Sequence, residues 1–221
     1  MSSAKPRIAE VLARYGRCHE LTPLDPNFHS ISVGLYEKDG VATVWTFSQR
    51  AGVQERIRQV RDQVVALGGL VPVEGTHNQA RYPCGQFHEK PIKFLMMQAV
   101  EKRPDFAPPE GAIQVKDTRT GLTLSVEGRE VDGRWVYRVS GEGQVPNIPA
   151  RLHAVAQGFV RYGGMELVDK TTVAFSCGHR HDELARLLLP FARNISAVES
   201  LMEASALRGQ LTTGTAGFTP V

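Results

Sequence analysis

The segment Cys84-Gly-Gln-Phe-His-Glu89 recurs 93 residues later as Cys177-Gly-His-Arg-His-Asp182. In both copies two residues separate a Cys-Gly pair from a histidine, and an acidic residue follows that histidine. Neighbouring positions agree at the same offset, namely Tyr82 with Phe175, Leu95 with Leu188 and Ala99 with Ala192. This agreement in residue type and spacing predicts that one structural unit occurs twice in the chain.

A hairpin signal precedes each copy of this motif. Asp39-Gly40 and Asp132-Gly133 each separate two runs in which apolar and polar residues alternate. An Asp-Gly pair between such runs is typical of a two-residue β-turn, because both turn positions require positive φ. The four runs that form these two predicted hairpins are 31–36, 41–47, 122–126 and 134–140.

Helical periodicity also recurs, at an offset of 95 residues. Apolar side chains are spaced four, three, four and three residues apart in 53–67 and again in 148–162. This spacing places one apolar stripe along a helix. Gly68-Gly69 and Gly163-Gly164 follow, and such pairs are typical of helix ends. Further helices are predicted at 6–15, from about His88 to Glu101, and from Asp182 onward.

The order of these elements predicts an α+β protein made of two β-hairpin/helix/β-hairpin/helix modules. We expect antiparallel sheets covered by helices, with a pseudo-two-fold axis relating the modules. The modules cover residues 31–103 and 122–195. Residues 1–30 are predicted as an N-terminal helix and loop, 104–121 as a linker, and 196–221 as a C-terminal helix and loose tail.

Composition excludes several classes of protein. The chain has 221 residues, three cysteines and a formal net charge of +3. A low, odd cysteine count argues against a secreted disulfide framework. No apolar run reaches the roughly 18 residues of a membrane span, and the first residues lack the apolar core of a signal peptide. We therefore expect a soluble, cytoplasmic protein without a membrane partner.

The repeated motif supplies thiol and imidazole groups that would meet if its two copies came together. These are the side chains that Zn²⁺ prefers, in a tetrahedral set of four. Glu89 and Asp182 would then orient the imidazoles from outside the ligand set. The pattern predicts zinc, another transition metal or a small molecule bound between the modules. The candidate metal ligands are Cys84, His88, Cys177, His179 and His181.

Two other interpretations of these residues stay open. Cys84 and Cys177 are also typical of small buried residues at strand ends, and the histidines or acids after them of helix caps. A cysteine shortly before a helix N-terminus is also typical of a nucleophile, because the helix dipole favours the thiolate. Under that interpretation Cys84 and Cys177 are catalytic residues of a Cys-His enzyme.

Aromatic and basic residues suggest further binding surfaces. Trp45, Trp135 and Tyr137 lie on the predicted hairpins, where they line a ligand cleft or pack a core or a homodimer face. Arginines on the two equivalent helices would suit a protein or nucleic-acid partner. Interleaved acids make nucleic acid the least favoured partner. The arginines are Arg56, Arg58, Arg61, Arg151 and Arg161.

Overall fold

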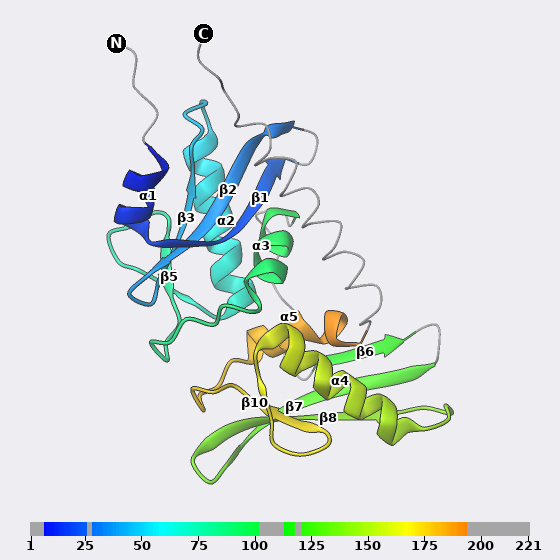
Figure 1. The fold of residues 1–221 in the computed structure, drawn as a ribbon. Coiled ribbons are helices and arrows are strands. Elements are labelled where there is room, and N and C mark those ends of the chain that lie inside the picture. Colours follow the sequence, from blue (N-terminus) through cyan, green and yellow to red (C-terminus); the bar gives the residue numbers. More distant parts are fainter. Residues whose placement is uncertain (1–6, 26–27, 102–112, 118–120, 194–221) are drawn as a thin grey trace, which may run out of the picture.

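The computed structural model describes residues 7–25, 28–101, 113–117 and 121–193, which form two groups of elements (Figure 1). The first group runs from α1 (Ile8–Tyr15) through β1 (Arg17–Asp25), β2 (Phe28–Lys38), β3 (Val41–Thr46), α2 (Val53–Gly68), β4 (Val71–Pro72) and β5 (Gln79–Arg81) to α3 (Ile92–Glu101). The second runs from β6 (Ile113–Asp117) through β7 (Leu122–Val131), β8 (Arg134–Glu142), α4 (Ile148–Gly163), β9 (Glu166–Leu167) and β10 (Thr172–Ala174) to α5 (Asp182–Ala192).

Each group contains one antiparallel sheet. The strand orders are β1-β2-β3-β5-β4 and β6-β7-β8-β10-β9. Helices α2 and α3 pack on the first sheet, and α4 and α5 pack on the second. The predicted α+β class, with antiparallel sheets covered by helices, is therefore confirmed.

The two predicted hairpins are present at their Asp-Gly turns. β2 pairs with β3 and β7 pairs with β8, both antiparallel. Asp39 and Gly40 have φ values of 54° and 78°, and Asp132 and Gly133 have 51° and 75°. Two successive residues with positive φ form the turn whose twist matches that of the flanking strands.

The predicted apolar stripes are largely buried. α2 buries its five stripe residues, and α4 buries Val155, Phe159 and Tyr162 from the equivalent stripe. Both helices end at a glycine in the left-handed region, Gly69 and Gly164, each with φ of 66°. The N–H groups of these glycines bond to the carbonyls of Val65 and Val160, which satisfies backbone groups at the helix ends.

Three pairs of corresponding elements have the same length and lie at an offset of 93 or 95 residues. β10 begins and ends 93 residues after β5. α4 follows α2, and β9 follows β4, at an offset of 95. The difference of two residues falls between β9 and β10, in the connection that leads to Cys177.

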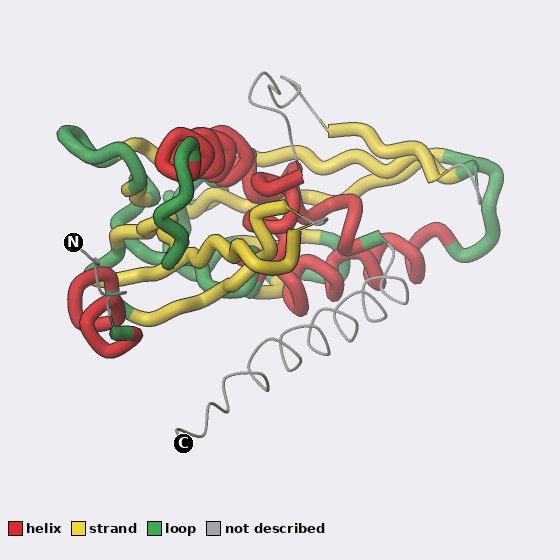
Figure 2. The backbone as a smooth tube through the Cα atoms, turned by 90° about the horizontal axis from the view of Figure 1, so that it is seen from above, coloured by secondary structure: helices red, strands yellow, loops and turns green. Residues whose placement is uncertain are grey.

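The two groups pack against each other through their helices. α5 contacts α4 in its own group and α2 and α3 in the other (Figure 1). Figure 2 shows the same backbone from above, with helices in red and strands in yellow. The ring of Phe94 on α3 lies 5.6 Å from that of Tyr162 and 4.3 Å from that of Phe191. Buried apolar side chains of both groups form one continuous core cluster.

Two strands lie where the sequence predicts loops. β1 falls within the predicted helix-and-loop segment 1–30, and β6 falls within the predicted linker 104–121. Both are edge strands, and an edge strand tolerates a proline such as Pro23. The module boundaries stay predictions, and the predicted tail 196–221 lies outside the described residues. No helix in the described ranges combines the length and apolar character needed to span a bilayer.

Candidate metal centre

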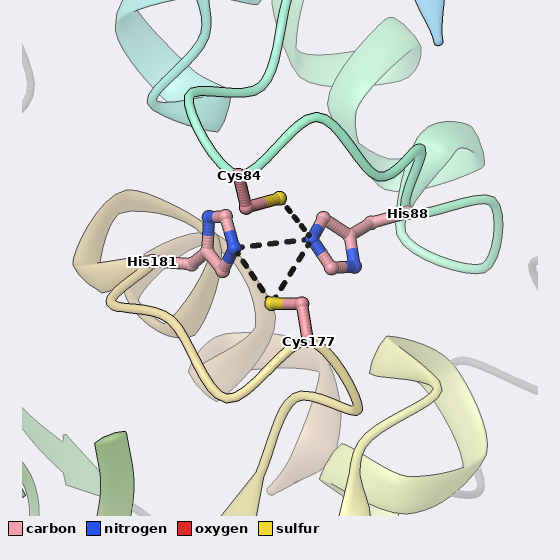
Figure 3. A group of neighbouring side chains, drawn as sticks. All are labelled: Cys84, His88, Cys177 and His181. Atoms are coloured by element: carbon pink, nitrogen blue, oxygen red, sulfur yellow. Dashed lines mark hydrogen bonds between the residues drawn. The ribbon is translucent and has the colours of Figure 1, made fainter. Parts of the chain in front are cut away.

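Two matching loops bring the repeated motif to one place. The N–H of Gly85 donates to the carbonyl of Tyr82, and the N–H of Gly178 donates to that of Phe175, both at 3.0 Å. Both glycines have positive φ, 76° and 71°, which residues with a Cβ rarely adopt. These turns follow β5 and β10, and each directs its cysteine toward the other group of elements (Figure 3).

Four of the five predicted ligands converge there. Their donor atoms all lie within 4.8 Å of one another, and they form a potential metal-binding group among the described residues. The two histidines face each other through Nε2, with 3.1 Å between these atoms. The group consists of Cys84, His88, Cys177 and His181.

Four of the six separations between donor atoms lie close to the edges of a tetrahedron. Zinc bonds of about 2.0–2.1 Å to nitrogen and about 2.3 Å to sulfur imply edges of about 3.3 Å between nitrogens and about 3.6 Å between nitrogen and sulfur. The Nε2–Nε2 separation is 3.1 Å. The Sγ–Nε2 separations are 3.5 Å for Cys84 and His88, 3.8 Å for Cys177 and His88, and 3.2 Å for Cys177 and His181. The other two separations, from Cys84 Sγ to Cys177 Sγ and to His181 Nε2, are at most 4.8 Å.

No family model, curated protein or solved structure matches this chain. The positions of its own donor atoms are therefore the observation that bears on function. Those atoms come from two loops that lie far apart in the sequence, one in each group of elements. A bound ion would connect the two groups directly.

The imidazole side of the cluster is enclosed by aromatic rings. His88 is 8% exposed and His181 is 3% exposed. The rings of Tyr82 and Phe175 lie 4.8 Å and 5.0 Å from that of His88, and Phe175 lies 5.1 Å from His181. Burial lowers the pKa of both histidines to about 4, and for His181 the nearby imidazoles add to this effect. Both rings are therefore neutral near pH 7, the form that binds metals.

The surroundings of Cys177 disfavour a free thiolate at that sulfur. Burial raises the pKa of Cys177, and the neighbouring Cys84 sulfur raises it further, although the N–H of His179 opposes the shift. A bound divalent cation would reverse this preference, because a coordinating thiol is deprotonated. The raised pKa of Cys177 therefore argues against this thiol as a free nucleophile near pH 7.

One contact supports the catalytic interpretation, but the charged thiolate–imidazolium pair that it needs is disfavoured. The Cys177 sulfur lies 3.2 Å from His181 Nε2. However, the raised pKa of this thiol and the lowered pKa of this imidazole favour two neutral groups over a thiolate and an imidazolium. α3 begins at Ile92, later than the predicted start near His88, so its N-terminus does not directly follow Cys84.

Tyr137 holds the loop that carries Cys177 and His181. The sequence predicts this residue in a ligand cleft, a core or a homodimer face and does not reveal its contact with this loop. The Tyr137 hydroxyl accepts the backbone N–H of His181 at 2.5 Å and donates to Asp182 Oδ1 at 3.1 Å. Arg180 Nε donates to Asp182 Oδ2 at 2.7 Å. These contacts bind Asp182 to a tyrosine and an arginine, rather than to an imidazole as predicted.

Trp135 lies beside the same loop. Its backbone N–H donates to the carbonyl of Gly178 at 2.8 Å, and the Arg180 guanidinium lies 5.0 Å from the centre of the indole ring. Trp45 packs against two tyrosines of the first group. Its ring centre lies 6.4 Å from that of Tyr36 and 5.7 Å from that of Tyr15. Trp45 thus has other neighbours than Trp135 and Tyr137, and a role of these residues in binding a ligand stays a prediction.

Glu89, the acidic residue of the loop that carries Cys84 and His88, has different partners from Asp182. Glu89 Oε1 lies 3.5 Å from Arg17 Nη2 and 3.4 Å from Nδ1 of His19, whose side chain is 4% exposed. The opposite nitrogen of His19 lies 3.6 Å from Glu37. No spacing in the sequence connects His19 with Glu89, because the two come from β1 and the loop before α3. The exposed His179 stays outside the cluster, although its N–H donates to the Cys177 sulfur at 3.4 Å.

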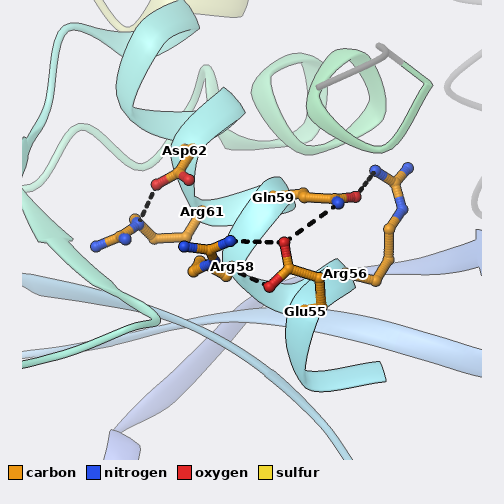
Figure 4. A network of polar contacts seen from close by, with 6 residues as sticks. All are labelled: Glu55, Arg56, Arg58, Gln59, Arg61 and Asp62. Atoms are coloured by element: carbon orange, nitrogen blue, oxygen red, sulfur yellow. Dashed lines mark hydrogen bonds and ion pairs between the residues drawn. The ribbon is translucent and has the colours of Figure 1, made fainter. Parts of the chain in front are cut away.

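The arginines of the predicted partner surface make contacts within the chain (Figure 4). Arg58 binds Glu55 at 2.7 Å and Arg61 binds Asp62 at 2.7 Å. Arg56 donates to the carbonyl of Val100 at the end of α3, also at 2.7 Å. In the second group, Arg151 donates to the carbonyl of Pro146, and the Arg161 guanidinium lies over the Tyr162 ring. These contacts give no support to a nucleic-acid surface.

Proposed function

We propose that this chain binds one Zn²⁺ ion between its two groups of elements, and that the ion clamps them together. The observation that carries the proposal is the convergence of four donor atoms within 4.8 Å, with four of the six separations close to the edges of a tetrahedron. Two thiolates and two neutral imidazoles would balance the charge of a divalent ion. The proposed ligands are Cys84, His88, Cys177 and His181.

The donor set favours a structural role for the ion. A catalytic zinc site leaves one coordination position for water or substrate, whereas a structural site fills all four with protein side chains. Here four side chains are available, two from each group. Shared Cys-x3-His spacing and the constant offsets between β5 and β10 also support an origin by duplication, with the two units related by a pseudo-two-fold axis. In this interpretation each unit contributes the same half-site.

Metal analysis of the purified protein tests this proposal. We expect about one zinc per chain after purification without chelator, and less than about a tenth of an equivalent would contradict it. Replacing the bound Zn²⁺ with Co²⁺ reports the coordination geometry of the site, because tetrahedral thiolate-bound Co²⁺ absorbs much more strongly in the visible range than octahedral Co²⁺. Weak octahedral absorption would contradict the four-coordinate site even if metal were retained.

Matched variants locate the binding site. We expect Cys84→Ser and His181→Ala to lose most of the bound metal, because each removes one of four donors. Cys18→Ser and His179→Ala are the controls, since both residues are exposed and lie outside the cluster. The controls should retain about one equivalent, measured by inductively coupled plasma mass spectrometry. Equal loss in His179→Ala and His181→Ala would place the ion elsewhere.

A further inference from the structure

The candidate metal centre is asymmetric in its exposure. The imidazoles of His88 and His181 are buried, whereas both cysteines are only half-buried. The residues beside the cysteines, Gln86 and Ser176, are exposed. Reagents in solution therefore reach the cluster from its sulfur side, while the aromatic rings shield its nitrogen side.

The two sulfur atoms are also close enough to react with each other. Their Sγ atoms lie within 4.8 Å, and a disulfide bond is about 2.05 Å long, so closure requires an approach of less than about 3 Å. Each cysteine lies in a loop between a strand and a helix rather than within either element. Rotation about χ1 and a small movement of either loop would supply this approach.

We propose that Cys84 and Cys177 form a reversible disulfide when a small-molecule disulfide reacts with the centre, and that this modification releases the metal. The release rests on the proposed function, whereas formation of the disulfide rests only on the proximity of the two sulfurs. The bond would join the same two loops that the ion connects. Oxidation therefore exchanges one link between the units for another.

The reaction is an ordinary thiol–disulfide exchange in two steps. One protein thiolate attacks the small disulfide R′SSR′, whose S–S bond breaks to give a protein mixed disulfide and R′S⁻. The second protein thiolate attacks the protein sulfur of that mixed disulfide and expels a second R′S⁻. The two protein thiolates lose two electrons in total, R′SSR′ gains them, and Zn²⁺ departs because its two anionic donors are gone.

Oxidised glutathione serves as the probe, in a Cys18→Ser background. Cys18 is the third cysteine, is exposed, and lies outside the metal group. We expect both remaining thiols to disappear while the intact mass of the chain falls by about 2 Da, the loss of two hydrogens. Peptide mapping should find the fragments of Cys84 and Cys177 joined. A chromophoric chelator should detect one zinc released per disulfide, and dithiothreitol should restore zinc binding.

The single variants separate the intramolecular bond from simple thiol modification. In the same background, Cys84→Ser and Cys177→Ser should each retain one attached glutathione, because no second thiol can displace it. Stable attachment of two glutathiones to the parent, or a disulfide between two chains, would overturn the inference. An internal disulfide in protein that never binds zinc would support thiol pairing but refute the metal clamp. Zinc binding without an internal disulfide would support the metal clamp but refute the pairing of the two thiols.

Discussion

The hydroxyl of Tyr137 connects strand β8 to the loop that carries two of the proposed ligands. It accepts the His181 N–H at 2.5 Å and donates to Asp182. Tyr137→Phe keeps the ring but leaves the buried N–H of His181 without an acceptor, which lowers the unfolding free energy by about 1–3 kcal/mol. Because residues that orient ligands affect metal affinity, we expect zinc binding to weaken about 10–100-fold. Competition with a chelator of known affinity measures this loss.

Tyr36→Phe is the matched control for that substitution. Tyr36 is also buried, and its hydroxyl interacts with Cys18, which lies outside the metal group. We expect this variant to change stability without changing zinc affinity. An unchanged affinity in Tyr137→Phe, or the same loss in both variants, would show that the hydroxyl does not position His181.

The sequence indicates the residue types of the candidate site better than their individual roles. The repeated Cys-x3-His spacing predicts four members of the cluster, and the structure brings them together. The sequence offers His179 as a fifth candidate ligand, and only tertiary packing shows that this residue is exposed whereas His181 is buried. Nor could spacing show that Asp182 binds Tyr137, since the two residues lie in different elements.

At the scale of the elements, Gly158 sets how closely α4 approaches α5. A Cβ at this position would lie 2.6 Å from the Ala192 carbonyl oxygen and 2.7 Å from its Cα, which are backbone atoms that cannot rotate away. We expect Gly158→Ala to lower the unfolding free energy by about 1–3 kcal/mol. This loss would outweigh the helix propensity of alanine, which favours the variant by about 1 kcal/mol. The midpoint of urea denaturation measures the net effect.

Gln157→Ala controls for propensity in the same helix turn. Gln157 is exposed, so its replacement should change the unfolding free energy by no more than about 0.5 kcal/mol. A Gly158→Ala protein as stable as the parent would mean that α5 can shift away at little cost. The close approach of the two helices would then not be a constraint on the fold.

The elements differ in how far their sequences reveal them. β2, β3, α2 and the equivalent elements of the second group combine a periodic apolar face with Asp-Gly turns or glycine caps, so local sequence is sufficient. The edge strands β1 and β6 have only one paired neighbour, and their pairing depends on β2 and β7 rather than on a strong pattern of their own. That dependence explains why the sequence predicts a loop and a linker there.

At the scale of the whole molecule, the apolar core connects the two groups independently of the proposed zinc ion. The core is one continuous set of buried apolar side chains, and α5 contacts helices of both groups. Burial of apolar surface does not depend on an ion. We therefore expect protein without zinc to keep its secondary structure, with the loops around Cys84 and Cys177 released from each other.

Removal of zinc by a chelator should accordingly reduce stability without unfolding the chain. An ion that binds only the folded state stabilises it by RT ln(1 + [L]/Kd), which is about 2.7 kcal/mol when free zinc is 100 times Kd. We expect the thermal midpoint to fall on chelation and to recover when zinc is added, while the far-ultraviolet circular dichroism at low temperature stays constant. Cys84→Ser should begin at the lower midpoint and respond little to chelator, because its donor set is incomplete. An equal response in parent and variant would assign the stabilising ion to another site, and collapse of the dichroism would show that the core cannot hold the two groups without metal.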